Sequence, residues 1–303
     1  MTHVALVSAD AALPLDEDMP PLVAAFRRLG VRVSTPSWDA ADVDWSLFDL
    51  ALLRSTWDYV ERLEEFLAWA RACGDQTRLF NPATVVAWNT DKHYLAELHT
   101  AGVAVVPTLF VEPGTDAAGA LQSFLTGARP LTAGAACEFD QFVVKPAVGA
   151  GSRDAARYRR GEQDRAGAHL HRLVELERRS AMLQPYLSTV DTEGETALMY
   201  LGGAASHAIR KGPLLRLDDG LVEGLFAPED IRRREPRQDE LALATSALAA
   251  LPFGLPLYAR VDMVRDGSGA PVVLEVELTE PSLFLAHAPG SADRLAHAAL
   301  ART

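Results

Sequence analysis

The sequence predicts a mixed α/β protein in which an N-terminal α/β domain precedes two further subdomains. The chain has 303 residues, enough for two or three packed units. Over residues 1–88, apolar strand-like segments alternate with amphipathic helical segments, which is typical of a parallel sheet covered by helices. Later in the chain, glycine turns separate strand pairs and indicate antiparallel hairpins. We expect domains at residues 1–88, 89–182 and 183–303.

The elements of the first domain follow from apolar runs bounded by glycine and proline. Helix 20–30 has prolines at its start and ends at Gly30, and helix 61–74 is amphipathic and predicted to end at Gly74. Strands are expected at residues 3–10, 31–36, 48–55 and 77–82. The alternation predicts a parallel sheet whose ligands bind at the carboxyl ends of its strands.

The remaining elements are less regular in their order. One helix is expected at residues 89–102, with Lys92 in its first turn. Residues 155–180 are rich in Arg and Glu and are predicted to be helical. Further strands are expected at residues 103–111, 142–146, 181–187, 195–201, 204–211, 258–264 and 270–278, and further helices at 238–250 and 291–301.

Charge and hydropathy exclude several classes of partner. The chain carries 29 Lys and Arg against 41 Asp and Glu, a net charge of −12, which argues against nucleic acid as a partner. We find no apolar run of the length that a membrane span needs, so no membrane partner is expected. The N-terminus resembles no signal peptide and the two cysteines match no zinc or redox spacing, so we expect a cytoplasmic protein. A homo-oligomer remains possible.

Acidic residues gather on one face of a predicted hairpin. Glu275 and Glu277 are two residues apart in a strand, so they share a face, whereas Leu274, Val276 and Leu278 are expected on the other. The preceding strand places Arg260 and Asp262 on one face, and the turn Asp266–Gly269 joins the two. Paired carboxylates repel one another, and Mg²⁺ would remove the conflict. The alternative is a solvent-exposed face with acids spaced by chance.

A second group of residues is typical of a phosphate site. Lys145 ends a β-branched strand, and a loop of small residues with Gly149 and Gly151 follows. Glycines allow backbone N–H groups to approach a phosphate, and the lysine adds a charge. The loop is neither a Walker A motif nor a dinucleotide fingerprint, and a flexible surface turn is the alternative. Lys92, Arg210 and Lys211 supply further cations.

A polar cluster follows the third strand of the first domain. It consists of Arg54, Ser55, Thr56, Trp57, Asp58 and Tyr59. Because it stands at the carboxyl end of a strand in a predicted parallel sheet, it could bind a small ligand. A turn with a helix cap is the alternative.

Taken in order, these motifs resemble the ATP-grasp family of carboxylate–amine ligases over roughly residues 89–284. The order is Lys92, Lys145 before its loop, LQPYL at 183–187, EGE at 193–195, then RVD at 260–262 and LEVEL at 274–278. The resemblance implies two subdomains that close on ATP, preceded by an α/β domain. It implies Mg²⁺ as a cofactor and an amino-acid-like small molecule as the substrate.

The resemblance also implies roles for individual residues. Contacts to ATP are expected from Lys92, Lys145, Gly149, Gly151, Ser152, Gln184, Pro185, Tyr186, Leu187 and Glu195. Asp262, Glu275 and Glu277 would bind Mg²⁺, although the family usually has Asn at the position of Glu277. Arg260, Lys145 and Arg210 would be catalytic. The substrate would contact Arg54, Ser55, Thr56, Asp58 and Ser282.

The implied chemistry is activation of a carboxylate by the γ-phosphate of ATP, followed by attack of a nitrogen nucleophile. The nitrogen can belong to the same molecule, which closes a ring, or to a second one, which joins two amino acids or peptides. A nucleotide-binding module without turnover is a third hypothesis. The combination of Asp262, Glu275 and Glu277 with Lys145 and Arg260 argues against it.

Overall fold

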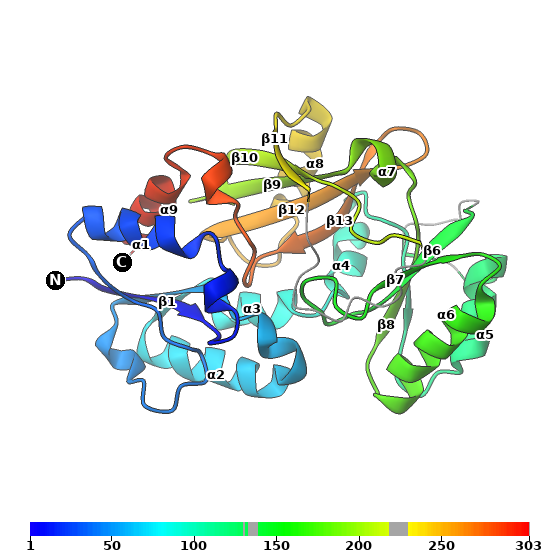
Figure 1. Ribbon diagram of the computed structural model, residues 1–303, viewed down its shortest axis with the longest axis horizontal. Coiled ribbons are helices and arrows are strands. Elements are labelled where there is room, and N and C mark those ends of the chain that lie inside the picture. The colour runs from blue at the N-terminus through cyan, green and yellow to red at the C-terminus, as the bar shows by residue number, and fades with distance from the viewer. Residues whose placement is uncertain (130, 133–138, 218–229, 303) are drawn as a thin grey trace.

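The protein folds around three sheets. The computed structural model describes residues 1–129, 131–132, 139–217 and 230–302. The strand orders are β2-β1-β3-β4, β5-β8-β6-β7 and β11-β10-β9-β12-β13. The first two sheets lie at opposite sides of the view in Figure 1, and the five-stranded sheet lies between them. The predicted α/β class, with antiparallel pairing beyond the first domain, is confirmed.

The N-terminal sheet is parallel, as the alternation predicted. Its strands are β1 (His3–Ser8), β2 (Arg32–Ser34), β3 (Leu50–Ser55) and β4 (Arg78–Phe80), and its helices are α1 (Met19–Arg28) and α2 (Leu63–Gln76). Three short 3₁₀ helices accompany them, η1 (Leu13–Leu15), η2 (Trp45–Leu47) and η3 (Trp57–Glu61). The predicted end of α2 at Gly74 is wrong, because a glycine costs only about 1 kcal/mol inside a helix and need not stop it.

Both faces of this sheet are buried. Leu6 and Leu52 pack with α1 and with the five-stranded sheet, whereas Val7 and Leu53 pack with α2 and a cluster of aromatic rings. Burial on both faces explains why the strands are continuously apolar. It also fixes the carboxyl ends of β1 and β3 against the rest of the molecule.

The second sheet is antiparallel. Its strands are β5 (Leu109–Val111), β6 (Gln141–Pro146), β7 (Ala156–Arg159) and β8 (Ala181–Pro185), covered by α5 (Ala117–Thr126) and α6 (Gln163–His171). The prediction of one helix over 155–180 is wrong, because its first residues form β7. Ala156 and Tyr158 alternate into the core there, a period of two. A π-helical turn, Arg172–Leu176, continues α6.

Two helices stand where one was predicted between the first two sheets. They are α3 (Ala83–Asn89) and α4 (Tyr94–Thr100), and Lys92 lies in the turn between them rather than in a first helical turn. The backbone N–H of Lys92 donates to the Ala147 carbonyl (3.1 Å), which ties this turn to the glycine loop. Both helices contribute to the core under the five-stranded sheet. The domain boundaries at 88/89 and 182/183 stay a prediction.

The five-stranded sheet carries the acidic hairpin. Its strands are β9 (Glu195–Leu201), β10 (Ala204–Lys211), β11 (Ile231–Arg234), β12 (Tyr258–Arg265) and β13 (Pro271–Glu277), with α7 (Thr189–Glu193), α8 (Gln238–Ala249), η5 (Leu285–His287) and α9 (Ser291–Leu300) around them. Gly202 and Gly203 form the predicted hairpin turn with φ of +67° and +90°. Among the described helices, none is long and apolar enough to cross a membrane.

Candidate active site

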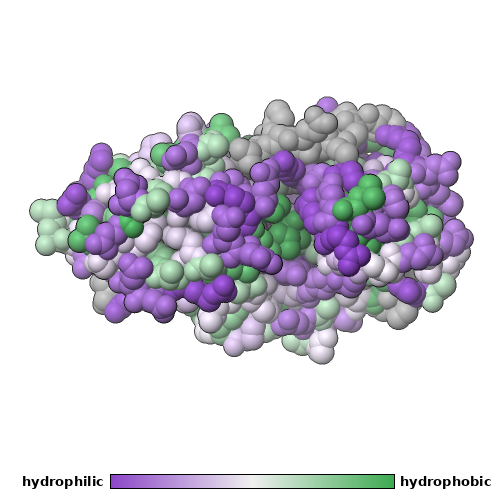
Figure 2. Space-filling model, turned by 90° about the horizontal axis from the view of Figure 1, so that it is seen from below, coloured by the Kyte–Doolittle hydropathy of each residue, from purple (hydrophilic) through white to green (hydrophobic). Residues whose placement is uncertain are grey.

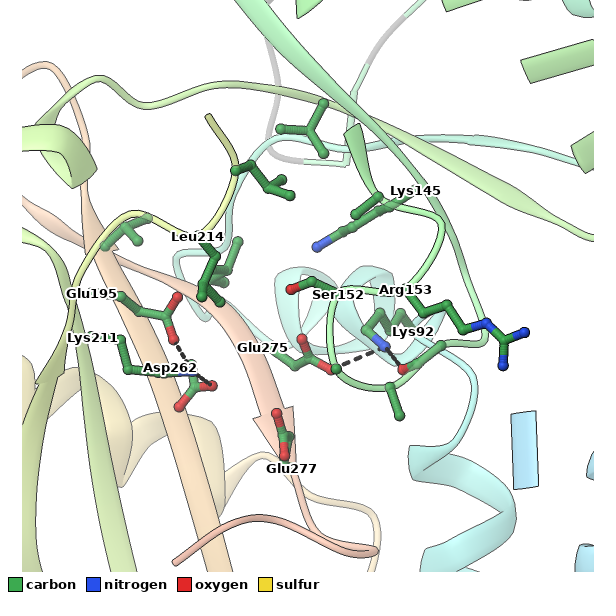
Figure 3. Close-up of a pocket in the computed structure, with 18 of the residues that line it drawn as sticks. Lys92, Lys145, Ser152, Arg153, Glu195, Lys211, Leu214, Asp262, Glu275 and Glu277 are labelled. Atoms are coloured by element: carbon green, nitrogen blue, oxygen red, sulfur yellow. Dashed lines mark hydrogen bonds and ion pairs between the residues drawn. The ribbon is translucent and has the colours of Figure 1, made fainter. Parts of the chain in front are cut away.

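A cavity lies between the second sheet and the five-stranded sheet. Every residue that was predicted to contact ATP lines it, and so do the three predicted metal ligands, Arg260 and Ser282. Figure 2 shows a hollow near the middle of one face, with hydrophobic side chains in it and hydrophilic ones on either side. Charged side chains from β6, β9, β10, β12 and β13 point toward one another in Figure 3.

The acidic hairpin has the predicted pairing. Asp262 lies opposite Glu275 and Arg260 lies opposite Glu277, while Val261 and Val276 face the core behind the sheet. The prediction that Leu274 faces the core is wrong, because the register shifts after Asp262. One extra residue in β13 forms a bulge, and Leu274 lines the cavity beside Glu275.

Cations hold each of these carboxylates. The Arg260 Nε donates to Asp262 Oδ1 (2.8 Å), and its Nη2 pairs with Glu277. Lys211 Nζ lies 2.8 Å from Asp262 Oδ2. Burial opposes ionisation of Asp262, but Arg260 and Lys211 hold the pKa of that carboxyl well below its usual range. Burial raises the pKa of Glu277 to about 7, although Arg260 opposes the shift.

Lys211 was recognised as a basic residue, but Arg210 was chosen in its place as catalytic. Lys211 is buried and pairs with Glu195 and Asp262, whereas Arg210 points to the other side of β10. The Arg210 Nε donates to the Glu193 carbonyl (2.8 Å), and Arg210 does not line the cavity. Strand alternation, together with the opposite position of Glu195 on β9, was the signal that distinguishes the two.

Among the residues that the structure describes, Lys145 is the lining lysine without a carboxylate partner. Lys92 Nζ lies 3.0 Å from Glu275 Oε1 and donates to the Gly149 carbonyl (2.8 Å), so it fixes the glycine loop. Within the described ranges, Lys145 has no Asp or Glu oxygen within 4.0 Å. Burial lowers the pKa of Lys145 to about 8. A buried cation of this kind favours an anionic ligand such as a phosphate.

The predicted link between the subdomains also reaches the cavity. The Gln184 Nε2 donates to Thr108 Oγ1 (2.8 Å), and the Tyr186 backbone N–H donates to the Gln141 carbonyl (2.8 Å). Arg157 stacks on the Tyr186 ring at 3.4 Å from its centroid. Burial raises the pKa of Glu195 to about 7, although the neighbouring Lys211 opposes the shift. The apolar side chains of Leu187 and Val264 complete this end of the cavity.

Most of the strand-end cluster that was predicted to bind substrate lies outside the cavity. Arg54, Ser55 and Thr56 are fully buried, and Arg54 donates to the Pro281 carbonyl (3.0 Å) and pairs with Asp18 (3.4 Å). Asp58 accepts from the Trp38 indole (2.8 Å). Direct ligand contact by Arg54 stays a prediction; in the structure, Arg54 is held against the loop after β13 by these two partners.

Trp57 and Tyr59 from the same cluster do line the cavity, together with Glu280, which the sequence analysis missed. η3 turns these two aromatic side chains toward Glu280 and away from solvent. Glu280 lies beyond the end of β13, so strand alternation gave no reason to select it.

The donor set of the hairpin fits a hard divalent cation. Asp262, Glu275 and Glu277 offer oxygen atoms on one cavity wall, and the raised pKa of Glu277 shows that an added positive charge is favoured there. Among the described residues, however, no three His, Cys, Asp or Glu side chains are close enough together to hold a metal ion. Each of the three carboxylates is paired with a cation instead, from Arg260, Lys92 or Lys211.

Fold and site define an ATP-grasp ligase, and comparisons with known proteins support this. A D-alanine–D-alanine ligase from Bacillus anthracis has the same fold, with a TM-score of 0.67 at 14% identity over 99% of this chain and 96% of that one. The ATP-grasp ligase PsnB matches with a TM-score of 0.65 at 18% identity over 100% of both chains. These two likenesses show that the chain has the ATP-grasp fold.

The particular family is that of D-cycloserine synthetase. A family model for the N-terminal domain of D-cycloserine synthetase DcsG matches residues 4–81. The cycloserine biosynthesis protein DcsG of Streptomyces lavendulae is 43% identical over 98% of both chains. A crystal structure of D-cycloserine synthetase DcsG superposes with a TM-score of 0.90 at 42% identity over 99% of both chains. The chain belongs to this family.

Proposed function

We propose that this enzyme closes a ring within O-ureido-D-serine on the route to D-cycloserine, in a pathway of antibiotic biosynthesis. The observation that carries the proposal is the match to DcsG over nearly the whole chain, including the N-terminal domain. ATP would transfer its γ-phosphate to the substrate carboxylate, and the nitrogen on the side-chain oxygen would then displace phosphate. Hydrolysis of the carbamoyl group on that nitrogen, which consumes one water and releases CO2 and ammonia, completes the conversion to D-cycloserine.

The residues of the cavity support each part of this reaction. Lys145, which has no carboxylate partner in the described part of the chain, and Lys92 are suited to hold the phosphates under the glycine loop. Arg260 is held by Asp262 and Glu277, so its charge is fixed where an acylphosphate would form. Bound Mg²⁺ would supply positive charge to the phosphate oxygens, and Asp262, Glu275 and Glu277 are the residues that would hold it.

An intermolecular amino-acid or peptide ligase of the same fold is the alternative, and a non-catalytic nucleotide-binding module is a third. We further propose that the enzyme acts in the cytoplasm without a nucleic-acid or membrane partner, which the net charge of −12 supports. A homo-oligomer is compatible with this proposal.

The test is turnover with a single carboxylate substrate. Purified enzyme is given ATP, Mg²⁺ and O-ureido-D-serine, and ADP, phosphate and product mass are measured. ADP release without an added amine, with a product lighter than the substrate, supports ring closure. ADP release that requires a second amine supports the intermolecular ligase. No ADP with any amino-acid substrate would contradict both ligases.

A further inference from the structure

The loop after β13, residues 278–285, carries Glu280 into the cavity and is held by buried side chains of three other segments. The Asn89 carboxamide oxygen accepts a backbone N–H at the start of the loop (2.7 Å). Arg54 donates to a carbonyl in its middle (3.0 Å), and Asp18 accepts two N–H groups near its end (2.5 and 2.6 Å). The position of Glu280 is therefore fixed before any ligand arrives.

Two aromatic residues of η3 fix Glu280 itself. The Trp57 indole N–H donates to the Glu280 backbone carbonyl (3.1 Å), and the Tyr59 hydroxyl is close enough to the Glu280 carboxylate to oppose the rise in its pKa. Both rings are buried and line the cavity. A neutral hydroxyl can orient a carboxylate but supplies no positive charge.

Glu280 differs from the other carboxylates of the cavity in having no cation beside it. Lys92 pairs with Glu275, and Arg260 pairs with Glu277. Lys211 pairs with Glu195 on β9 and with Asp262 on β12. For the described part of the chain, no Lys, Arg or His nitrogen lies within 4.0 Å of the Glu280 carboxylate. A positively charged group of a ligand could therefore pair with the Glu280 carboxylate.

Arg260 lies near the same loop and provides the opposite charge. Its Nη1 donates to the Ser282 carbonyl (3.0 Å), two residues beyond Glu280. A zwitterionic amino acid can therefore present its carboxylate toward Arg260 and its ammonium toward Glu280. A carboxylic acid without the ammonium would leave the Glu280 carboxyl without a charged partner.

We propose that Glu280, oriented by Tyr59 and Trp57, binds the α-ammonium group of the substrate and thereby selects amino acids over plain carboxylic acids. The proposal rests on the ligase function stated above and assigns a specificity-determining residue to it. It also accounts for the strand-end motif of the N-terminal domain, whose two aromatic side chains reach the cavity. Burial and the nearby Glu277 raise the pKa of Glu280 to about 8, and a bound ammonium would lower it again.

The first experiment compares O-ureido-D-serine with its des-amino analogue in the wild type, Glu280→Gln and Tyr59→Phe. The wild type should prefer the amino substrate in kcat/KM by about tenfold to a hundredfold, the worth of a hydrogen bond to a charged group. Glu280→Gln should remove this preference while the KM for ATP stays unchanged, and Tyr59→Phe should reduce it. An unchanged preference in Glu280→Gln would overturn the proposal. Glu235→Gln, an exposed acid outside the cavity, is the matched control.

The second experiment needs no turnover and therefore separates this proposal from the proposed reaction. Binding of D-serine and D-glycerate, which differ only in the α-substituent, is measured by calorimetry with ADP and Mg²⁺ present. The wild type should bind D-serine more tightly, and Glu280→Gln should bind both equally. Equal binding by the wild type, or no binding of D-serine, would overturn the assignment. In the kinetic experiment, a rise in the Mg²⁺ concentration for half-maximal activity in Glu280→Gln would also overturn the assignment, since it would place Glu280 at the metal.

Discussion

Lys145 shows how burial prepares a single side chain for an anionic ligand. The residue lies near the end of β6, and its charged neighbours in the cavity are Lys92, Lys211, Glu195 and Glu275. Burial lowers its pKa to about 8. The lysine is charged below this pKa and neutral above it. A nearby phosphate would raise the pKa again, so nucleotide binding and the protonation of Lys145 are coupled.

This coupling predicts that ADP binds more weakly as the pH rises through 8. Between pH 7 and pH 9 the charged fraction of Lys145 falls by roughly tenfold, so its part of the affinity falls by a similar factor. Calorimetric Kd values across this range measure the effect. In Lys145→Arg the charge persists at pH 9, so the dependence should be flatter; an equally steep dependence would show that another group titrates.

Glu275 is the second residue whose role can be isolated. Glu275→Gln should lower kcat by about a hundredfold to a thousandfold, as loss of a charge-stabilising group at a reacting centre does. The carboxylate is partly exposed, so loss of its ion pair with Lys92 should change the free energy of unfolding by about 1 kcal/mol or less. Steady-state kinetics and denaturation measure the two effects, and an active variant would refute the proposed metal role.

At the scale of elements, residues at and beyond the carboxyl ends of β1 and β3 bind the backbone of the loop after β13. Arg54, at the end of β3, is fully buried and binds both Asp18 and the Pro281 carbonyl. Asp18, just before α1, accepts backbone N–H groups from the same loop. The end of the parallel sheet thus positions a loop of the active site.

Arg54→Ala should therefore destabilise the fold. The substitution leaves Asp18 buried without its cation, at a cost of roughly 3–5 kcal/mol in the free energy of unfolding. Chemical denaturation measures the loss, and Arg233→Ala, which removes an exposed arginine, should change stability little. Unchanged stability with a raised KM for the amino acid would instead support the original prediction that Arg54 contacts substrate.

At the scale of the whole molecule, the cavity is shared between two sheets that belong to separate cores. Residues of β6 and β8 pack in the core of the second sheet, whereas β12 and β13 pack under the five-stranded sheet. A nucleotide in the cavity would contact both sheets at once. Its binding free energy would then stabilise the folded arrangement of the two sheets against each other.

ADP with Mg²⁺ should raise the thermal midpoint. At a concentration of one hundred times Kd, the folded state gains about 2.7 kcal/mol, which corresponds to several degrees for a chain of this size. Differential scanning calorimetry over a nucleotide titration measures the shift. Lys145→Ala should reduce it at the same concentration, and an unchanged midpoint in the wild type would argue against nucleotide binding in this cavity.

The sequence by itself determined what depends on local periodicity and order. Alternation along β12 and β13 placed Asp262, Glu275 and Glu277 on one face, and the order of lysine, glycine loop and acidic strand indicated the class of ligase. These features need only neighbouring residues or a single hairpin. Their geometry is therefore encoded within a few positions of the chain.

Only the tertiary structure decided which of several adjacent polar residues reach the cavity. The end of β3 offered six candidates, and packing against a loop more than 200 residues away buried Arg54 and exposed Trp57 and Tyr59 to the cavity. Glu280 lies beyond the last strand, where no period specifies direction. The direction of a side chain at a strand end depends on the segment that packs against it. Contacts between segments far apart in the sequence decide which segment that is.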